Sequence, residues 1–125
     1  MKKFFAVTAL ALAFVASAFA SQKPTVTDFQ MVPGGPFTRA GVAPYNFYFS
    51  PSTITRDGHT VAFVVEAIPT DGTPIRYSAY GFKCDTNQYA YMTYDENTDT
   101  WSELSELKDI TPNTANAYVK PLVCQ

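Results

Sequence analysis

The sequence predicts a mainly β or α+β domain: a small antiparallel sheet of four to five strands, with a short C-terminal helix tied on by a disulfide. Short stretches rich in β-branched and aromatic residues recur between residues 46 and 94. The turns between them are short and carry Asp-Gly or proline, which favours hairpins over the long crossovers that parallel strands need. After residue 20, helical signals occur only near the C-terminus.

The first 20 residues have the pattern of an export signal that is removed from the mature protein. Lys2 and Lys3 form a positive n-region, residues 4–15 form an apolar core, and Ala18-Phe19-Ala20 is a small-x-small cleavage site. The apolar run is shorter than the roughly 18 residues that a membrane-spanning helix needs. We therefore predict cleavage after Ala20, a periplasmic location and no membrane span in the mature protein.

The mature chain has the length of one small domain and a small negative net charge. Removing 20 of the 125 residues leaves 105, among which seven basic and eleven acidic residues give a formal net charge of −4. This balance argues against nucleic acid as a partner, because phosphate contacts need clustered Lys and Arg. The chain carries no recognisable catalytic or cofactor motif, so the sequence predicts no catalytic residue, metal or cofactor.

Two cysteines, Cys84 and Cys124, are the only ones in the chain. In an oxidising compartment such a pair usually bonds, and here it would close a loop of about 40 residues. Closing that loop constrains the unfolded state by roughly 3–4 kcal/mol. The alternatives are two free thiols or a metal site. The metal site is disfavoured because His59 is the only histidine available to complete a tetrahedral ligand set.

Residues 21–45 are expected to form an irregular lead-in to a single β-rich domain that spans residues 46–125. Proline lacks the N–H that a strand ladder needs, and glycine loses the most entropy on ordering; both are frequent before residue 46. A short strand is expected at residues 47–49. Pro51 then turns the chain, and Asp57-Gly58 forms a second turn.

Residues 59–68 form the strongest predicted strand. Its nearly continuous apolar run indicates a central strand that is covered on both faces. After a turn at residues 69–74, residues 75–84 and 88–94 are expected to form an antiparallel hairpin. Strand alternation divides each strand between two faces. In the first strand it separates Arg76, Ser78, Tyr80 and Phe82 from Ile75, Tyr77, Ala79 and Gly81, and in the second it separates Tyr89, Tyr91 and Thr93 from Ala90, Met92 and Tyr94.

The C-terminal third is less regular. Apolar residues occur at every third position of residues 101–110, which predicts either one or two helical turns or an irregular edge with one face packed down. Residues 114–120 predict a short helix that is capped by Asn113 or Thr114 and ends before Pro121.

The aromatic residues between residues 77 and 101 are the main candidates for function. Such side chains could form a platform for a sugar, a peptide or a partner protein, although in small β domains they more often form core and half-buried sheet surface. Arg76 shares a face with Tyr80, so Arg76, Tyr80 and Trp101 are the candidate binding residues. The expected partner is an envelope protein or a glycan.

Two other classes of protein remain as alternatives. His59 beside Asp57, or a pair of carboxylates, would suit a small hydrolase, although a solvated turn histidine is favoured. An inhibitor or toxin-neutralising module would instead present a protruding loop at residues 69–74 or 95–100. The acidic residues of 95–109 suggest calcium only loosely, because the glycine and terminal glutamate of a calcium loop are missing.

A series of motifs runs from the first Asp-Gly turn to the C-terminus. They are Asp57-Gly58 before a hydrophobic strand, Tyr-x-x-Tyr-Gly-Phe-Lys-Cys at 77–84, Tyr89-Ala90-Tyr91, Trp101, and the closing Leu122-Val123-Cys124. Over about residues 46–125 this order resembles the cryptic neisserial protein-like family, small exported proteins of Gram-negative bacteria without an established biochemical activity. The resemblance implies a periplasmic location and no particular substrate.

The chain departs from that family pattern at two places. The family tends to have an arginine where this chain has Val61 or Ala62, and an acidic residue where it has Tyr80. A site built on those charges would therefore be changed here. Together, these features predict a non-enzymatic periplasmic domain with a binding or structural role in the envelope.

Overall fold

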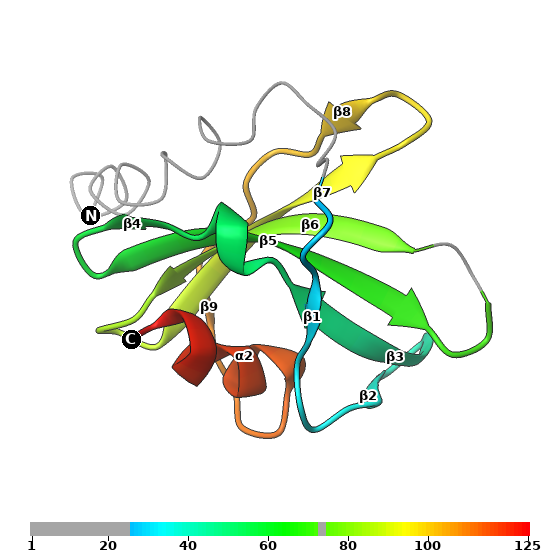
Figure 1. The fold of residues 1–125 in the computed structure, drawn as a ribbon, viewed down its shortest axis with the longest axis horizontal. Helices are drawn as coiled ribbons and strands as arrows, with labels where there is room; N and C mark the ends of the chain where they lie inside the picture. Colours follow the sequence, from blue (N-terminus) through cyan, green and yellow to red (C-terminus); the bar gives the residue numbers. More distant parts are fainter. Residues whose placement is uncertain (1–25, 73–74) are drawn as a thin grey trace.

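The computed structural model describes residues 26–72 and 75–125 (Figure 1). Within these residues the strands are β1 (Gln30–Met31), β2 (Phe37–Arg39), β3 (Val42–Phe49), β4 (Thr55–Asp57), β5 (Thr60–Pro69), β6 (Arg76–Lys83), β7 (Gln88–Asp95), β8 (Thr100–Trp101) and β9 (Lys108–Asp109). A 3-10 turn, η1 (Pro51–Thr53), and helix α2 (Ala115–Val123) complete the fold. The export signal and the cleavage site after Ala20 lie outside the described residues.

All of these strands belong to one antiparallel sheet. Its main path is β1-β3-β5-β6-β7-β8; in addition, β2 pairs with β3, β4 with β5 and β9 with β7. The sheet twists strongly, and α2 lies against one side of it (Figure 1). The predicted class is confirmed, and the nine strands among the described residues make the sheet larger than the predicted four to five.

Strands β5, β6 and β7 form the centre of the sheet in a continuous register. Phe63 of β5 lies opposite Tyr80 of β6, which lies opposite Tyr91 of β7. Because directly opposite residues share a face, this register agrees with the predicted alternation within each strand and places the Tyr80 face of β6 together with the Tyr91 face of β7. The apolar run at residues 61–65 is buried, as expected for a central strand.

The main core lies between α2 and the sheet face that carries Phe63 and Phe82. Each Val or Phe side chain fully buried there contributes roughly 1.5–3 kcal/mol. The buried members are Val32, Phe37, Phe47, Phe49, Val61, Phe63, Val65, Phe82, Ile110, Ala115, Val119 and Val123.

A second, smaller core covers the opposite face of the sheet. Four buried residues, Ala62, Ala79, Ala90 and Met92, contact Trp101, Leu104 and Leu107. The segment between β8 and β9 is held along β7, because Ser102 N donates to Thr93 O at 2.8 Å and Ser105 N donates to Tyr91 O at 2.8 Å. The three-residue spacing of residues 101–110 therefore forms an irregular edge, and the helical alternative is wrong.

Residues 21–45, expected to be an irregular lead-in, instead contribute β1, β2 and the start of β3 in their described part. Val32 and Phe37 are buried in the main core. The glycines form turns there: Gly34 has φ +103°, and a Cβ added to it would lie 2.8 Å from the Tyr118 ring. The high glycine and proline content thus reflects tight turns between short strands.

Asp28 connects the start of this segment to η1 through hydrogen bonds. Its Oδ1 accepts hydrogen bonds from Ser50 Oγ at 2.6 Å and Ser52 Oγ at 2.9 Å, and its Oδ2 accepts one from Ser52 N at 2.9 Å. These bonds favour the ionised carboxylate, with the Ser50 hydroxyl contributing most, and hold the pKa of Asp28 below its usual value of 3.8.

We expect Asp28→Asn to destabilise the protein at neutral pH but much less in acid. The folded-state pKa is lower than the unfolded one, so the stabilisation is present above pH 3.8 and is lost as the pH falls through the folded-state value. Urea unfolding of wild type and variant at about pH 7 and about pH 2.5 measures this difference. Asp57→Asn, an exposed carboxylate in the β4–β5 turn, is the control. A difference that is equally large at both pH values would contradict the prediction.

Helix α2 starts where predicted but extends further. Thr114 is the N-cap, and its side chain accepts a hydrogen bond from Ala117 N at 3.3 Å. The expected stop before Pro121 is wrong, because that proline lies inside the helix. Pro121 has no backbone N–H, so one hydrogen-bond donor is missing near the C-terminal end of the helix. Cys124 N nevertheless donates to Lys120 O at 2.8 Å. Burial of Val123 and the disulfide at the next residue hold the last turn in place.

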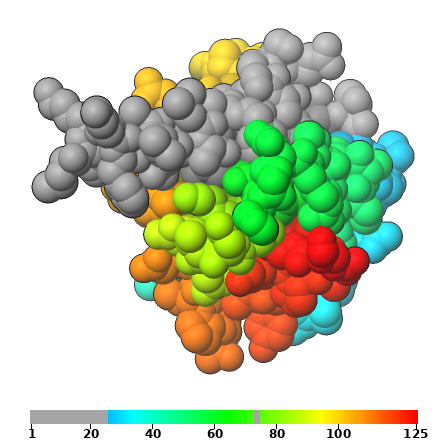
Figure 2. Space-filling model, turned by 90° about the vertical axis from the view of Figure 1, so that its left-hand side faces the viewer, coloured from blue at the N-terminus to red at the C-terminus, as the bar shows by residue number. Residues whose placement is uncertain are grey.

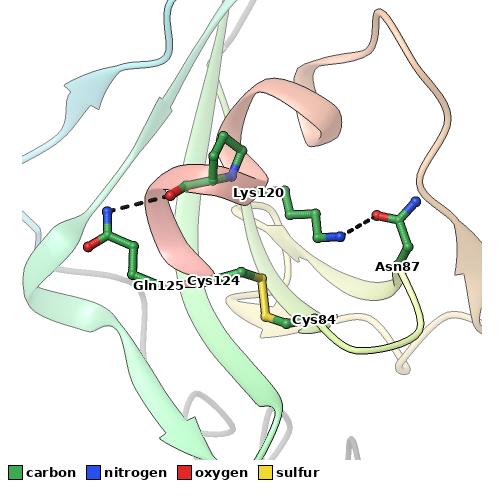
Figure 3. The surroundings of a disulfide bond; sticks show 6 residues. Cys84, Asn87, Lys120, Cys124 and Gln125 are labelled. Atoms are coloured by element: carbon green, nitrogen blue, oxygen red, sulfur yellow. Dashed lines mark hydrogen bonds between the residues drawn. A yellow bond between two sulfur atoms is a disulfide. The ribbon is translucent and has the colours of Figure 1, made fainter.

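The predicted disulfide is confirmed. Cys84, just after β6, is bonded to Cys124, just after α2, with a Cα–Cα distance of 5.7 Å. Beside it, Lys120 Nζ donates to Asn87 Oδ1 at 2.7 Å (Figure 3). The C-terminal residues pack beside the ends of the β4–β5 and β6–β7 hairpins (Figure 2). In the part of the chain that the structure describes, no helix has the length and apolar character to cross a membrane.

Candidate functional site

An open cleft of about 510 Å³ lies on the same sheet face as the main core, where α2 does not cover it. Strands β3, β5, β6 and β7 supply its floor. One side is formed by β2 and the other by β9 and the first turn of α2. The cleft therefore joins residues from almost the whole described chain.

Four tyrosines, Tyr45, Tyr80, Tyr89 and Tyr91, are the main aromatic lining of the cleft. The rings of Tyr80 and Tyr89 have centroids 5.8 Å apart at 15°, and those of Tyr80 and Tyr91 have centroids 5.7 Å apart at 24°. Side chains stand roughly perpendicular to a sheet, so the hydroxyl ends of these rings point away from it. The near-parallel rings therefore stand beside one another on the sheet, with their hydroxyl ends toward the opening of the cleft.

Tyr80 is the central member of this cluster. Its ring also contacts Phe47 at 5.9 Å and Phe63 at 6.1 Å between centroids. Burial is the main cause that raises the pKa of Tyr80 well above its usual value of 10.0, with Tyr89 as the next contribution. Burial also raises the pKa of Tyr45. Both phenols therefore stay protonated and able to donate a hydrogen bond.

The hydroxyls of the four tyrosines are not engaged by other side chains. Among the hydrogen bonds between side chains of residues 26–72 and 75–125, none involves any of these four groups. They keep their full capacity to donate and accept, and a ligand or solvent can use it.

Three cationic side chains surround the tyrosines: Arg39 of β2, Arg76 of β6 and Lys108 of β9. Arg39 is close enough to Tyr45 and Tyr80 to oppose the rise in the pKa of both. Within the described residues neither arginine takes part in an ion pair, and Lys108 has only a loose one with Glu106 at 3.8 Å. The single carboxylate of the lining is that of Asp109, so the cleft has a positive balance.

The structure brings two of the three predicted binding residues together. Arg76 and Tyr80 both line the cleft. Trp101 lies on the opposite face, where its ring packs edge-to-face on Tyr94 with centroids 5.3 Å apart and helps to cover the smaller core. Trp101 is therefore separated from the cleft by the sheet itself.

Sequence reasoning missed Arg39, Tyr45 and Lys108. Tyr45 has a local signal, because it alternates with Phe47 and Phe49 along β3 and so belongs to the core face. Arg39 and Lys108 have no such local signal in a single sequence. They reach the cleft only through the pairing of β2 with β3 and of β9 with β7.

The residues of the hydrolase alternative lie elsewhere. Asp57 and His59 are both exposed at the β4–β5 turn. His59 borders a smaller hollow of about 220 Å³ beside the disulfide, and Asp57 is not part of its lining. No group of three His, Cys, Asp or Glu side chains within residues 26–72 and 75–125 lies close enough to hold a metal ion.

The loop at residues 95–100 is one of the two loops that an inhibitor is expected to present. It is a turn held by hydrogen bonds among its own and adjacent residues. Asn97 N donates to Asp95 Oδ1 at 2.9 Å, and the Tyr94 hydroxyl donates to Asp99. The loop at residues 69–74 includes two residues outside the described part of the chain. The tyrosine cleft gathers more polar side chains than the smaller hollow beside the disulfide.

The fold and this site define a class: a disulfide-closed antiparallel β domain with an open, cationic, tyrosine-floored cleft. Comparison of the chain with protein-family models, with curated proteins and with solved structures found no match. The chemistry of the cleft is therefore the basis on which a function is assigned.

Proposed function

We propose that this protein is a non-enzymatic binding domain that holds a small ligand in the tyrosine cleft. The observation that carries the proposal is the convergence of four tyrosines and three cations in one cleft of about 510 Å³. Small-molecule sites typically occupy about 300–1,000 Å³ and combine apolar walls with a few convergent polar groups. Tyrosine suits such a site because its ring packs while its hydroxyl bonds.

The location of this domain is part of the proposal. We propose export to the periplasm by the leader at residues 1–20, which the Cys84–Cys124 disulfide supports because such bonds persist in oxidising compartments. Membership of the cryptic neisserial protein-like family, suggested by the motifs of residues 57–124, agrees with the same location and stays a proposal. Ligands of the envelope are therefore the first to test.

Export and binding are tested on one preparation. The full gene, with its leader, is expressed and the protein is isolated from the periplasm; its mass should correspond to a chain that starts at Ser21. A thermal-shift screen of sugars, amino acids, short peptides and fatty acids then identifies a ligand, and amide chemical shifts locate it. We expect the largest shifts on β6, β7 and the start of α2.

Two matched variants make this test specific. Tyr89→Phe removes one cleft hydroxyl and should weaken binding by about two- to tenfold, the range for one hydrogen bond. Tyr48→Phe removes a hydroxyl on the opposite face of the sheet and should leave binding unchanged. Ligands whose shifts map to the Trp101 face, or equal effects of both variants, would refute the cleft as the binding site.

A further inference from the structure

We propose that the ligand of this cleft is an acidic saccharide, a polyhydroxylated molecule that carries a carboxylate. This inference rests on the proposed function, because it assigns the chemical class of the ligand that the same cleft binds. Three features of the lining carry it: its hydroxyl content, its cations, and the way in which the tyrosine rings are arranged.

The lining is unusually rich in hydroxyl groups. Nine of its twenty residues carry one: four tyrosines, four threonines and a serine. Each hydroxyl both donates and accepts, so an array of them matches a ligand whose own groups do the same. Sugars present such groups on every side. A purely apolar ligand would leave these groups without partners, and an unpartnered buried polar group costs roughly 1–3 kcal/mol.

The cations select a charged sugar over a neutral one. Arg39 and Arg76 line the cleft without an ion pair in the described chain, and guanidinium groups bind carboxylates with two parallel hydrogen bonds. Thr114, Ala115 and Asn116, at the start of α2, also border the cleft and add the partial positive charge of a helix N-terminus. Asp109 opposes this potential, which suits one local anion better than a long polyanion.

The ring arrangement argues against a flat platform for neutral sugars. Such a platform needs an exposed aromatic face, whereas Tyr80, Tyr89 and Tyr91 lie near-parallel with centroids 5.7–6.3 Å apart. Because side chains stand roughly perpendicular to a sheet, these rings stand beside one another, and they present their hydroxyl ends to a ligand instead of one flat ring face. Recognition by hydrogen bonds and charge is therefore favoured over stacking.

Titration calorimetry with digalacturonate as the probe tests this inference. We expect binding that weakens as salt is raised, and a loss of about tenfold or more in Arg39→Gln and in Arg76→Gln. Both arginines are exposed, so these variants should fold normally. Arg56→Gln, an exposed cation that borders only the smaller hollow, should keep affinity within about twofold.

Two further probes separate the contributions of charge and of hydroxyl groups. The dimethyl ester of digalacturonate keeps the hydroxyls without the charge, and succinate keeps carboxylates without the sugar; we expect both to bind at least about tenfold more weakly. Equal binding of the ester or of succinate would overturn the inference. The inference would also be overturned if digalacturonate did not bind while a compound of another class from the screen shifted the cleft residues. The proposed function would still stand in that case. If no compound shifts the cleft, both fail.

Discussion

Replacement of both Cys84 and Cys124 by serine should lower the free energy of unfolding by about 3–4 kcal/mol. The bridge spans 40 residues, so its loss gives the unfolded chain back the entropy of a large closed loop. For a domain of this size the corresponding fall in melting temperature is about 15–25 °C. Urea and thermal unfolding without reductant measure the two quantities.

Two controls separate the covalent bond from its surroundings. Wild-type protein in reductant should lose as much stability as the double variant. Lys120→Ala removes the 2.7 Å hydrogen bond to Asn87 beside the bridge and should cost less than about 1.5 kcal/mol. A double variant that unfolds within about 1 kcal/mol of wild type would show that α2 is held by packing alone.

The central strands could be predicted because their information is local. The apolar run of residues 61–65 and the two-residue alternation of residues 76–94 specify strands and faces without reference to distant parts of the chain. The disulfide is predicted from a count of two cysteines in a chain that is itself predicted to be exported. Arg76 and Tyr80 were found for the same local reason, since they share a face of β6.

The rest of the cleft depends on pairings between distant segments. Arg39 reaches it through β2, whose register with β3 shifts between Phe37 and Arg39, an irregularity that local composition does not encode. Lys108 reaches the cleft through β9, a two-residue strand that pairs with the first residues of β7. The glycines near residue 34 predict an irregular arm, because sequence alone does not distinguish a flexible glycine from one that forms a turn against a ring.

Two substitutions of Tyr80 should separate its structural role from its role in the cleft. Tyr80→Ala deletes a ring that contacts five other aromatic rings and should cost about 3–5 kcal/mol, as for other large-to-small changes in a core. Tyr80→Phe keeps the ring and removes a hydroxyl that no other described side chain engages. It should change stability by less than about 1 kcal/mol at neutral pH.

The stability of the protein at alkaline pH gives an independent measure of how strongly the Tyr80 hydroxyl is buried. Because the folded-state pKa of Tyr80 is raised above the unfolded value of 10.0, its stabilisation is complete below pH 10.0 and is lost as the pH rises beyond that value. Wild type should therefore lose stability faster than Tyr80→Phe between about pH 9 and about pH 11 in urea unfolding. Equal slopes would show that the phenol is as hydrated as in the unfolded chain. The burial of Tyr80 in the folded protein would then not be the cause of a raised pKa.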